Sequence, residues 1–124
     1  MNILPFPIPR TESLNSAASV IEIFAHLESV PRAVILFVDE SQFCRSYTEV
    51  PWIKAHGVSV VDLDRDILDA FEIEKVPTYQ FYILGQLVGN LIGTASESEF
   101  IEIKNELFQN QDILKEQKEL FTVV

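Results

Sequence analysis

The amino-acid sequence predicts an α/β fold, in which a central mixed sheet of four or five strands is flanked by helices on both faces in three α/β/α layers. Helical and strand-like patterns alternate along the chain, which favours parallel strands joined by crossover helices. Two later strand-like runs surround a glycine-containing turn, which is typical of an antiparallel hairpin. The 124 residues, 48% of them hydrophobic, suffice for one domain with one sizeable core.

The first half of the chain predicts two helices and two buried strands. Residues 1–10 should be extended, because three prolines at alternating positions fix φ and remove amide donors. Apolar side chains near a 3.6-residue period predict a helix over residues 13–29. Residues 33–38 read AVILFV, a continuous apolar run that suits a strand buried on both faces. A short helix within residues 44–56 and a second buried strand over residues 58–63 follow. On the first helix, the predicted core face comprises Leu14, Ala17, Ala18, Ile21, Phe24, Ala25 and Leu27.

The second half predicts a short helix, a hairpin and a last helix. Residues 66–71 can form the short helix, and residues 76–84 and 87–92 form the two strands around a Gly-Gln turn. Ser96 opens the last helix, because Glu99 three residues later completes a capping box. The predicted core face of that helix comprises Phe100, Ile101, Ile103, Leu107 and Phe108.

These elements divide the chain into three segments. An extended segment covers residues 1–10, the folded domain covers residues 11–109, and a helical extension or tail covers residues 110–124. The last segment contains apolar residues at recurring positions, which favours a helix lying on the domain or binding a partner.

Charge and composition exclude several classes of function. Nineteen acidic residues against nine basic ones give a net charge of −10, which disfavours a nucleic acid or an anionic membrane as partner. The same charge serves solubility or steers the chain toward a basic partner. The one cysteine, Cys44, excludes an internal disulfide, and no apolar run is long enough to cross a bilayer. Because the N-terminus lacks the pattern of a signal peptide, we expect a cytosolic or nuclear protein and take the cytoplasm as its location.

The sequence shows no pattern of a metal or cofactor site. His26 and His56 lack ligand spacing with Cys44. The run of acids that begins at Asp62 lacks the glycine and the glutamate that a calcium-binding loop requires. No glycine-rich phosphate loop occurs among the four glycines. We therefore expect no metal and no cofactor.

A family resemblance rests on the segment after residue 75. Val76-Pro77-Thr78 is followed by Gly85, eight residues after the proline, and by Gly93, eight residues later. This spacing resembles the C-terminal half of thioredoxins, in which Ile/Val-Pro-Thr, Asn-Gly and Val-Gly mark the same places. The resemblance covers roughly residues 13–109 and implies a thioredoxin-like fold with a cis Val76–Pro77 bond. It also implies that the backbone of Val76 is open to an extended peptide.

The active-site motif of thioredoxins, Trp-Cys-Gly-Pro-Cys, is degenerate in this chain. The corresponding residues 43–47 read FCRSY, so that a tyrosine takes the place of the second cysteine and the resolving thiol is missing. In this alignment Val38 replaces the family's buried aspartate, and Asp39 lies one residue away. A second alignment places Cys44 on the second cysteine and Ser41 on the first.

The first functional hypothesis is a non-catalytic module that binds a partner protein or an extended peptide. The peptide would lie along Val76 and Pro77, with Phe43 and Gly93 beside it.

The second hypothesis is a monothiol thiol-disulfide oxidoreductase or redox sensor acting through Cys44. The start of a helix and the neighbouring Arg45 would favour the thiolate of Cys44. Cys44 equally suits a small core residue without chemistry. A monothiol glutaredoxin that binds glutathione is disfavoured, because Lys75 replaces the threonine that this family has two residues before the proline, and no Gly-Gly pair follows.

Overall fold

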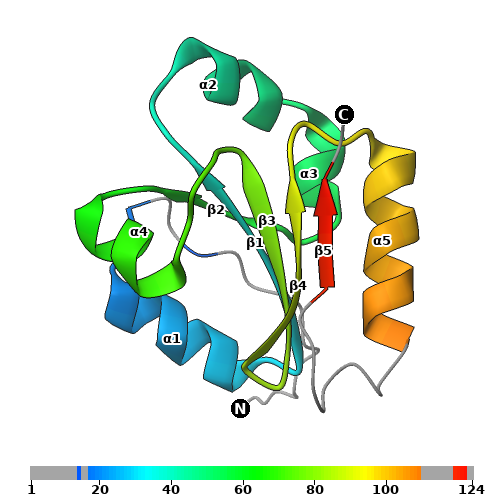
Figure 1. The fold of residues 1–124 in the computed structure, drawn as a ribbon, viewed down its shortest axis with the longest axis horizontal. Coiled ribbons are helices and arrows are strands. Elements are labelled where there is room, and N and C mark those ends of the chain that lie inside the picture. Colours follow the sequence, from blue (N-terminus) through cyan, green and yellow to red (C-terminus); the bar gives the residue numbers. More distant parts are fainter. Residues whose placement is uncertain (1–13, 15–16, 110–118, 123–124) are drawn as a thin grey trace, which may run out of the picture.

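Figure 1 shows the computed structural model, which describes residue 14, residues 17–109 and residues 119–122. The helices are α1 (Val20–Ser29), α2 (Gln42–Thr48), α3 (Pro51–Ala55), α4 (Arg65–Phe71) and α5 (Glu97–Gln109). The strands are β1 (Arg32–Val38), β2 (Ser59–Asp62), β3 (Thr78–Ile83), β4 (Gln86–Ile92) and β5 (Glu119–Thr122). Among these residues, none of the helices has the length and apolar character needed to span a membrane.

The strands form one mixed sheet in the order β2-β1-β3-β4-β5. The interior strand β1 runs parallel to β2, with Ile35 opposite Ser59, and antiparallel to β3, with Phe37 opposite Thr78. Strands β3 and β4 form the predicted antiparallel hairpin. The prediction of a mixed sheet with helices on both faces is confirmed.

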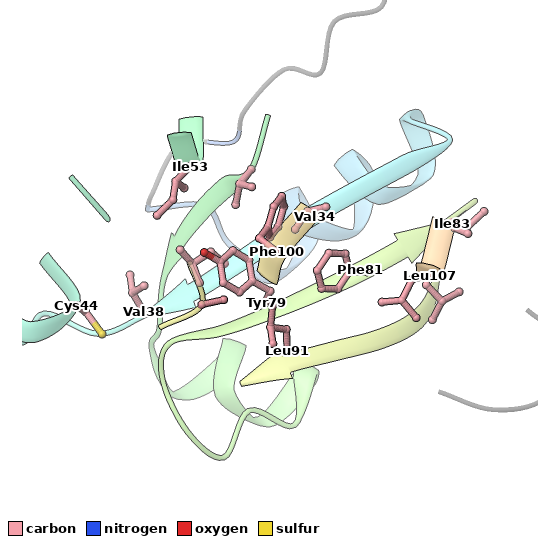
Figure 2. Packing of buried hydrophobic residues seen from close by; sticks show 14 residues of the cluster. Val34, Val38, Cys44, Ile53, Tyr79, Phe81, Ile83, Leu91, Phe100 and Leu107 are labelled. Atoms are coloured by element: carbon pink, nitrogen blue, oxygen red, sulfur yellow. The ribbon is translucent and has the colours of Figure 1, made fainter. Parts of the chain in front are cut away.

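Helices cover the two faces of the sheet over two separate cores (Figure 1). Helices α1 and α4 pack on one face, where Ile23, Leu27 and Phe71 meet the inward side chains of β1. Helices α2, α3 and α5 supply the other core, shown in Figure 2, where Phe100 and Leu107 lie among the side chains of β3. Residues 33–38 of β1 are buried throughout and contribute alternately to both cores, as expected for a strand covered on both faces.

The first helix is shorter than predicted, and its buried face is different. It begins at Val20 because Ser19 caps it: the Ser19 hydroxyl accepts from the Glu22 amide at 3.3 Å, and the Glu22 carboxylate accepts from the Ser19 amide at 2.7 Å. Ile23 and Leu27 are buried, four residues apart. The predicted core residues Ile21 and Phe24 are 80% and 47% exposed. The prediction of both positions was wrong, because the apolar pattern extends around more of the helix than the sheet can cover.

The segment after β1 holds two short helices where the sequence predicted one. Pro51 separates them, because it has no amide hydrogen to continue α2 and its fixed φ suits the first turn of a new helix. Val50 precedes it with an extended backbone, and His56 ends α3 beside Gly57, as predicted.

At the C-terminal end of the chain, the predicted start of the last helix is confirmed and the predicted helical extension is corrected. Ser96 and Glu99 form the predicted capping box, with the Glu99 carboxylate 2.8 Å from the Ser96 amide. Residues 119–122, in contrast, form a parallel strand beside residues 89–92, not a helix. Their backbone pairs with the edge of β4 that would otherwise be open. The remaining residues of the predicted extension, 110–118 and 123–124, and the predicted extended segment 1–10 lie outside the described part.

Candidate functional site

The candidate site lies at the end of the sheet where β1 stops and α2 begins. This end also holds the connection from α4 to β3 and the connection from β4 to α5 (Figure 1). All the residues that the sequence singled out for function belong to these three connections or to α2.

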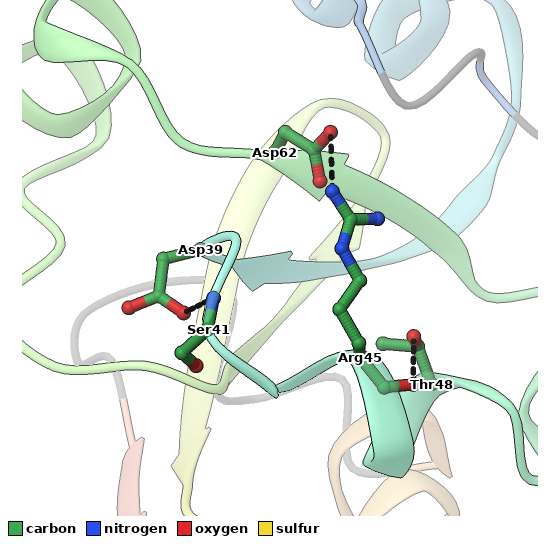
Figure 3. A network of polar contacts seen from close by, with 5 residues as sticks. All are labelled: Asp39, Ser41, Arg45, Thr48 and Asp62. Atoms are coloured by element: carbon green, nitrogen blue, oxygen red, sulfur yellow. Dashed lines mark hydrogen bonds and ion pairs between the residues drawn. The ribbon is translucent and has the colours of Figure 1, made fainter. Parts of the chain in front are cut away.

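Ser41 is the exposed N-cap residue of α2. Its hydroxyl accepts a hydrogen bond from the Cys44 amide at 3.2 Å and so caps the helix. Its own amide donates to the Asp39 carboxylate at 3.0 Å, as Figure 3 shows. Hydrogen bonds from Ser41, together with one from the Cys44 side chain, hold the pKa of the Asp39 carboxyl below its usual value. Asp39 therefore stays ionised at neutral pH.

Cys44 lies in the first turn of α2 and is only 1% exposed. Its side chain belongs to the core between α2, α3 and α5 and lies beside Val38 in Figure 2. In this conformation a disulfide partner cannot reach the sulfur atom.

Arg45 follows Cys44 on α2, but its side chain extends toward β2 (Figure 3). One guanidinium nitrogen lies 4.0 Å from the Asp62 carboxylate at the end of β2, and the Arg45 side chain is 49% exposed. The other carboxylate oxygen of Asp62 is buried without a hydrogen-bond partner. The arginine charge is thus directed at this carboxylate.

Tyr47 anchors α2 to the rest of the domain, a role that the sequence did not indicate. Its hydroxyl is hydrogen-bonded to the hydroxyl of Tyr79 on β3 and donates to the Ala95 carbonyl at 2.8 Å. The two rings meet edge to face, with centroids 6.4 Å apart. Burial raises the pKa of both tyrosines. Because Tyr47 and Tyr79 are 32 residues apart, no local sequence pattern connects them.

The connection before β3 brings Val76, Pro77 and Gly93 together. The Val76–Pro77 peptide bond is cis. The Pro77 carbonyl accepts from the Gly93 amide at 3.0 Å, and the Lys75 carbonyl accepts from the Thr78 hydroxyl at 2.6 Å. Within the described part of the chain, neither the amide nor the carbonyl of Val76 makes a hydrogen bond.

Phe43 and the histidines complete the set of residues named from the sequence. Phe43 lies on the outer side of α2 and is 61% exposed. The His56 ring contacts the rings of Trp52 and Phe100, and its Nε2 is 3.1 Å from a carboxylate oxygen of Glu97. Across residues 14, 17–109 and 119–122, no group of three or more His, Cys, Asp or Glu side chains is arranged to hold a metal ion.

Comparisons with known proteins find similar proteins by structure alone. No family model matches the chain, and no curated protein matches it by sequence. A thioredoxin variant from Halobacterium salinarum superposes with a TM-score of 0.60 at 16% identity, over 73% of this chain and 87% of that one. The oxidised thioredoxin of Plasmodium falciparum gives a TM-score of 0.56 at 17% identity, over 71% and 91% of the two chains. Mitochondrial thioredoxin 3 of Saccharomyces cerevisiae, also oxidised, gives a TM-score of 0.55 at 23% identity, over 69% of this chain and 89% of that one. These similarities show that the chain has a thioredoxin-like fold.

Proposed function

On this thioredoxin-like fold, we propose that the chain is a non-catalytic binding module that holds an extended segment of a partner protein along Val76 and Pro77. One observation supports this most directly: the amide and carbonyl of Val76 make no hydrogen bond among the described residues. An extended peptide supplies one acceptor and one donor in the geometry of an added strand, so it can satisfy both groups.

The residues around Val76 suit a peptide better than a small substrate. Gly93 is held beside Pro77 by the hydrogen bond between their backbones, and it brings no side chain to the surface. Phe43 exposes 61% of its surface on α2, and an exposed aromatic ring of this kind commonly anchors an interface. The peptide would thus pair with backbone at Val76 and pack side chains against the ring.

The position of Cys44 supports binding over chemistry. Thiol exchange requires a thiolate that a disulfide can approach, and Cys44 is 1% exposed. Ser41, three residues earlier at the N-cap of α2, is exposed. This favours the alignment in which Ser41 replaces the first cysteine of the thioredoxin motif, since the attacking thiol must be the accessible one. A serine hydroxyl cannot perform that exchange.

Partner and location follow from charge and cysteine content. With a net charge of −10, the partner in this proposal is a protein segment, and neither a nucleic acid nor an anionic membrane. A cytoplasmic location suits a chain whose one cysteine cannot form an internal disulfide.

The proposal is tested by selecting short random peptides displayed on phage against the immobilised protein. We expect an enriched pool whose binding falls about tenfold in the variant Phe43→Ala, because an anchoring aromatic residue contributes about 1–2 kcal/mol. The matched control is Ile21→Ala, which also removes a large exposed apolar side chain, but from α1, and should leave binding unchanged. If no peptide pool is enriched over the uncoated surface, or if both variants lose binding equally, the proposal is wrong.

The alternative function, a monothiol oxidoreductase or redox sensor acting through Cys44, predicts a different outcome. Selected peptides would then contain cysteine, and their binding would be released by a reductant and abolished in Cys44→Ala. The binding module predicts that Cys44→Ala retains the peptide pool and that reductant has no effect.

A further inference from the structure

An apolar groove adjoins the proposed peptide edge and shares Val76 with it. It has a volume of about 300 Å³ and lies between α4, the end of β2 and the connection to β3. Its apolar lining comes from Leu63, Leu68, Ile73 and Val76. Leu68 is 42% exposed, although it is a large apolar side chain. A chain paired with the Val76 backbone would place a side chain at this groove.

The charged side chains around the groove are mostly acidic. Asp39, Asp64 and Glu74 border it, against a single cation, Lys75. Two of these carboxylates are held in place by the fold: Asp39 accepts from the Ser41 amide, and Asp64 caps α4 by accepting from the Ile67 amide at 2.9 Å. Their hydrogen bonds leave one oxygen or lone pair of each carboxylate for a further donor. Three carboxylates around an apolar lining complement a ligand with both apolar and cationic side chains.

We infer that the partner segment held at Val76 is basic, with an apolar side chain in the groove and lysine or arginine side chains that reach Asp39, Asp64 and Glu74; this inference rests on the proposed binding function. Strand geometry fits the arrangement. In an extended peptide, residues two positions apart point to the same side, about 7 Å from one another. An apolar residue in the groove therefore has its neighbours at positions ±2 directed at the surrounding carboxylates.

The experiment compares peptide pools selected on three forms of the full chain. The wild type is set against Asp39→Asn/Asp64→Asn/Glu74→Gln, in which each substituted side chain keeps an oxygen that accepts hydrogen bonds, so the cap of α4 and the Ser41 contact are retained. The matched control, Glu28→Gln/Glu102→Gln/Glu106→Gln, removes three exposed carboxylates from α1 and α5 and changes the net charge equally. Circular dichroism verifies that all three forms are folded.

We expect the wild-type pool and the control pool to be enriched in lysine and arginine relative to the input library, and the pool on the groove variant to lose this enrichment. A synthetic peptide from the wild-type pool should bind the groove variant about tenfold more weakly in fluorescence anisotropy, since each exposed ion pair contributes up to about fivefold. Its affinity for the wild type should also fall as salt rises to about 0.5 M.

The outcomes separate this inference from the proposed function. A pool that depends on Phe43 but shows no excess of basic residues would overturn the inference and leave the peptide edge in place. A basic pool that both triple variants bind equally well, or equally poorly, would also overturn it, because overall charge and not the groove would then explain the preference. If no peptide pool can be selected on the wild type, both the proposed binding function and this inference are wrong.

Discussion

The hydroxyl groups of Tyr47 and Tyr79 form a pair whose energetic coupling can be measured. Tyr47 is the residue that one alignment places on the second cysteine of the thioredoxin motif, and in the structure its hydroxyl joins α2 to β3 and to the Ala95 carbonyl. Replacing either tyrosine with phenylalanine removes one hydroxyl and leaves the aromatic packing intact. The double variant removes both.

The expected magnitudes follow from which groups lose a partner. Tyr47→Phe leaves the Tyr79 hydroxyl inside the core, where the side chain is 0% exposed, and also removes the donor to Ala95, so we expect a loss of about 2 kcal/mol in the free energy of unfolding. Tyr79→Phe should cost about 1 kcal/mol, because Tyr47 still donates to Ala95. The double variant should lose about 2 kcal/mol, since no tyrosine hydroxyl is then left buried without a partner.

Urea unfolding, followed by circular dichroism, measures all four forms. A coupling of about 1 kcal/mol between the two substitutions is expected. The control pairs Tyr47→Phe with Tyr82→Phe, whose hydroxyl donates to Gln80 on the opposite face of the sheet, and these two losses should add. If the Tyr47 and Tyr79 losses also add, the reasoning that the two hydroxyls satisfy each other is refuted.

Three further predictions concern accessibility, pH and backbone conformation. Iodoacetamide should alkylate Cys44 at least about 100-fold more slowly in the native protein than in urea, because the sulfur reacts only after local opening; equal rates would favour the monothiol alternative. Burial raises the pKa of Tyr79 and Tyr82, so both stay protonated in the folded protein while the unfolded chain loses these protons above about pH 10. Because the pKa of each tyrosine is higher in the folded state, the stability that this difference contributes is present below about pH 10 and is lost as the pH rises further. The loss in the free energy of unfolding is about 1.4 kcal/mol per pH unit for each tyrosine. A tyrosinate absorbance that rises before the protein unfolds would contradict this. Gly85→Ala should lower the free energy of unfolding by about 1 kcal/mol, because Gly85 has φ +79° at the β3–β4 turn, and an unchanged urea midpoint would argue against that strain.

The parts of the fold that could be predicted from the sequence are those with a local physical signal. The continuous apolar run of β1 predicts burial on both faces, and the pair Ser96 and Glu99 predicts the start of α5 through two hydrogen bonds three residues apart. The start of α1 escaped prediction because Ser19 and Glu22 form an equally good capping box further along the same apolar pattern. Strand β5 escaped because its pairing depends on a partner strand far away in the chain.

The candidate site shows the same division. The proximity of Pro77 and Gly93 was predictable from spacing that resembles a known family, and the structure shows it as one backbone hydrogen bond. The burial of Cys44 and the hydrogen bond of Tyr47 to Tyr79 required the tertiary structure, because both depend on how α2 lies against β3. A motif comparison reveals which chemical groups are missing, whereas only packing reveals which of the remaining groups are accessible.

The strand order also has a consequence for the growing chain on the ribosome. Strand β1 emerges before both of its neighbours, and the neighbour that completes its second edge is β3, whose last residue is Ile83. Until that residue has left the exit tunnel, the most apolar strand of the protein has one row of backbone groups unpaired and lacks the core residues of α5. Nascent chains arrested before that point should therefore resist proteases poorly, and protection should arise abruptly once the hairpin and the last helix are both available.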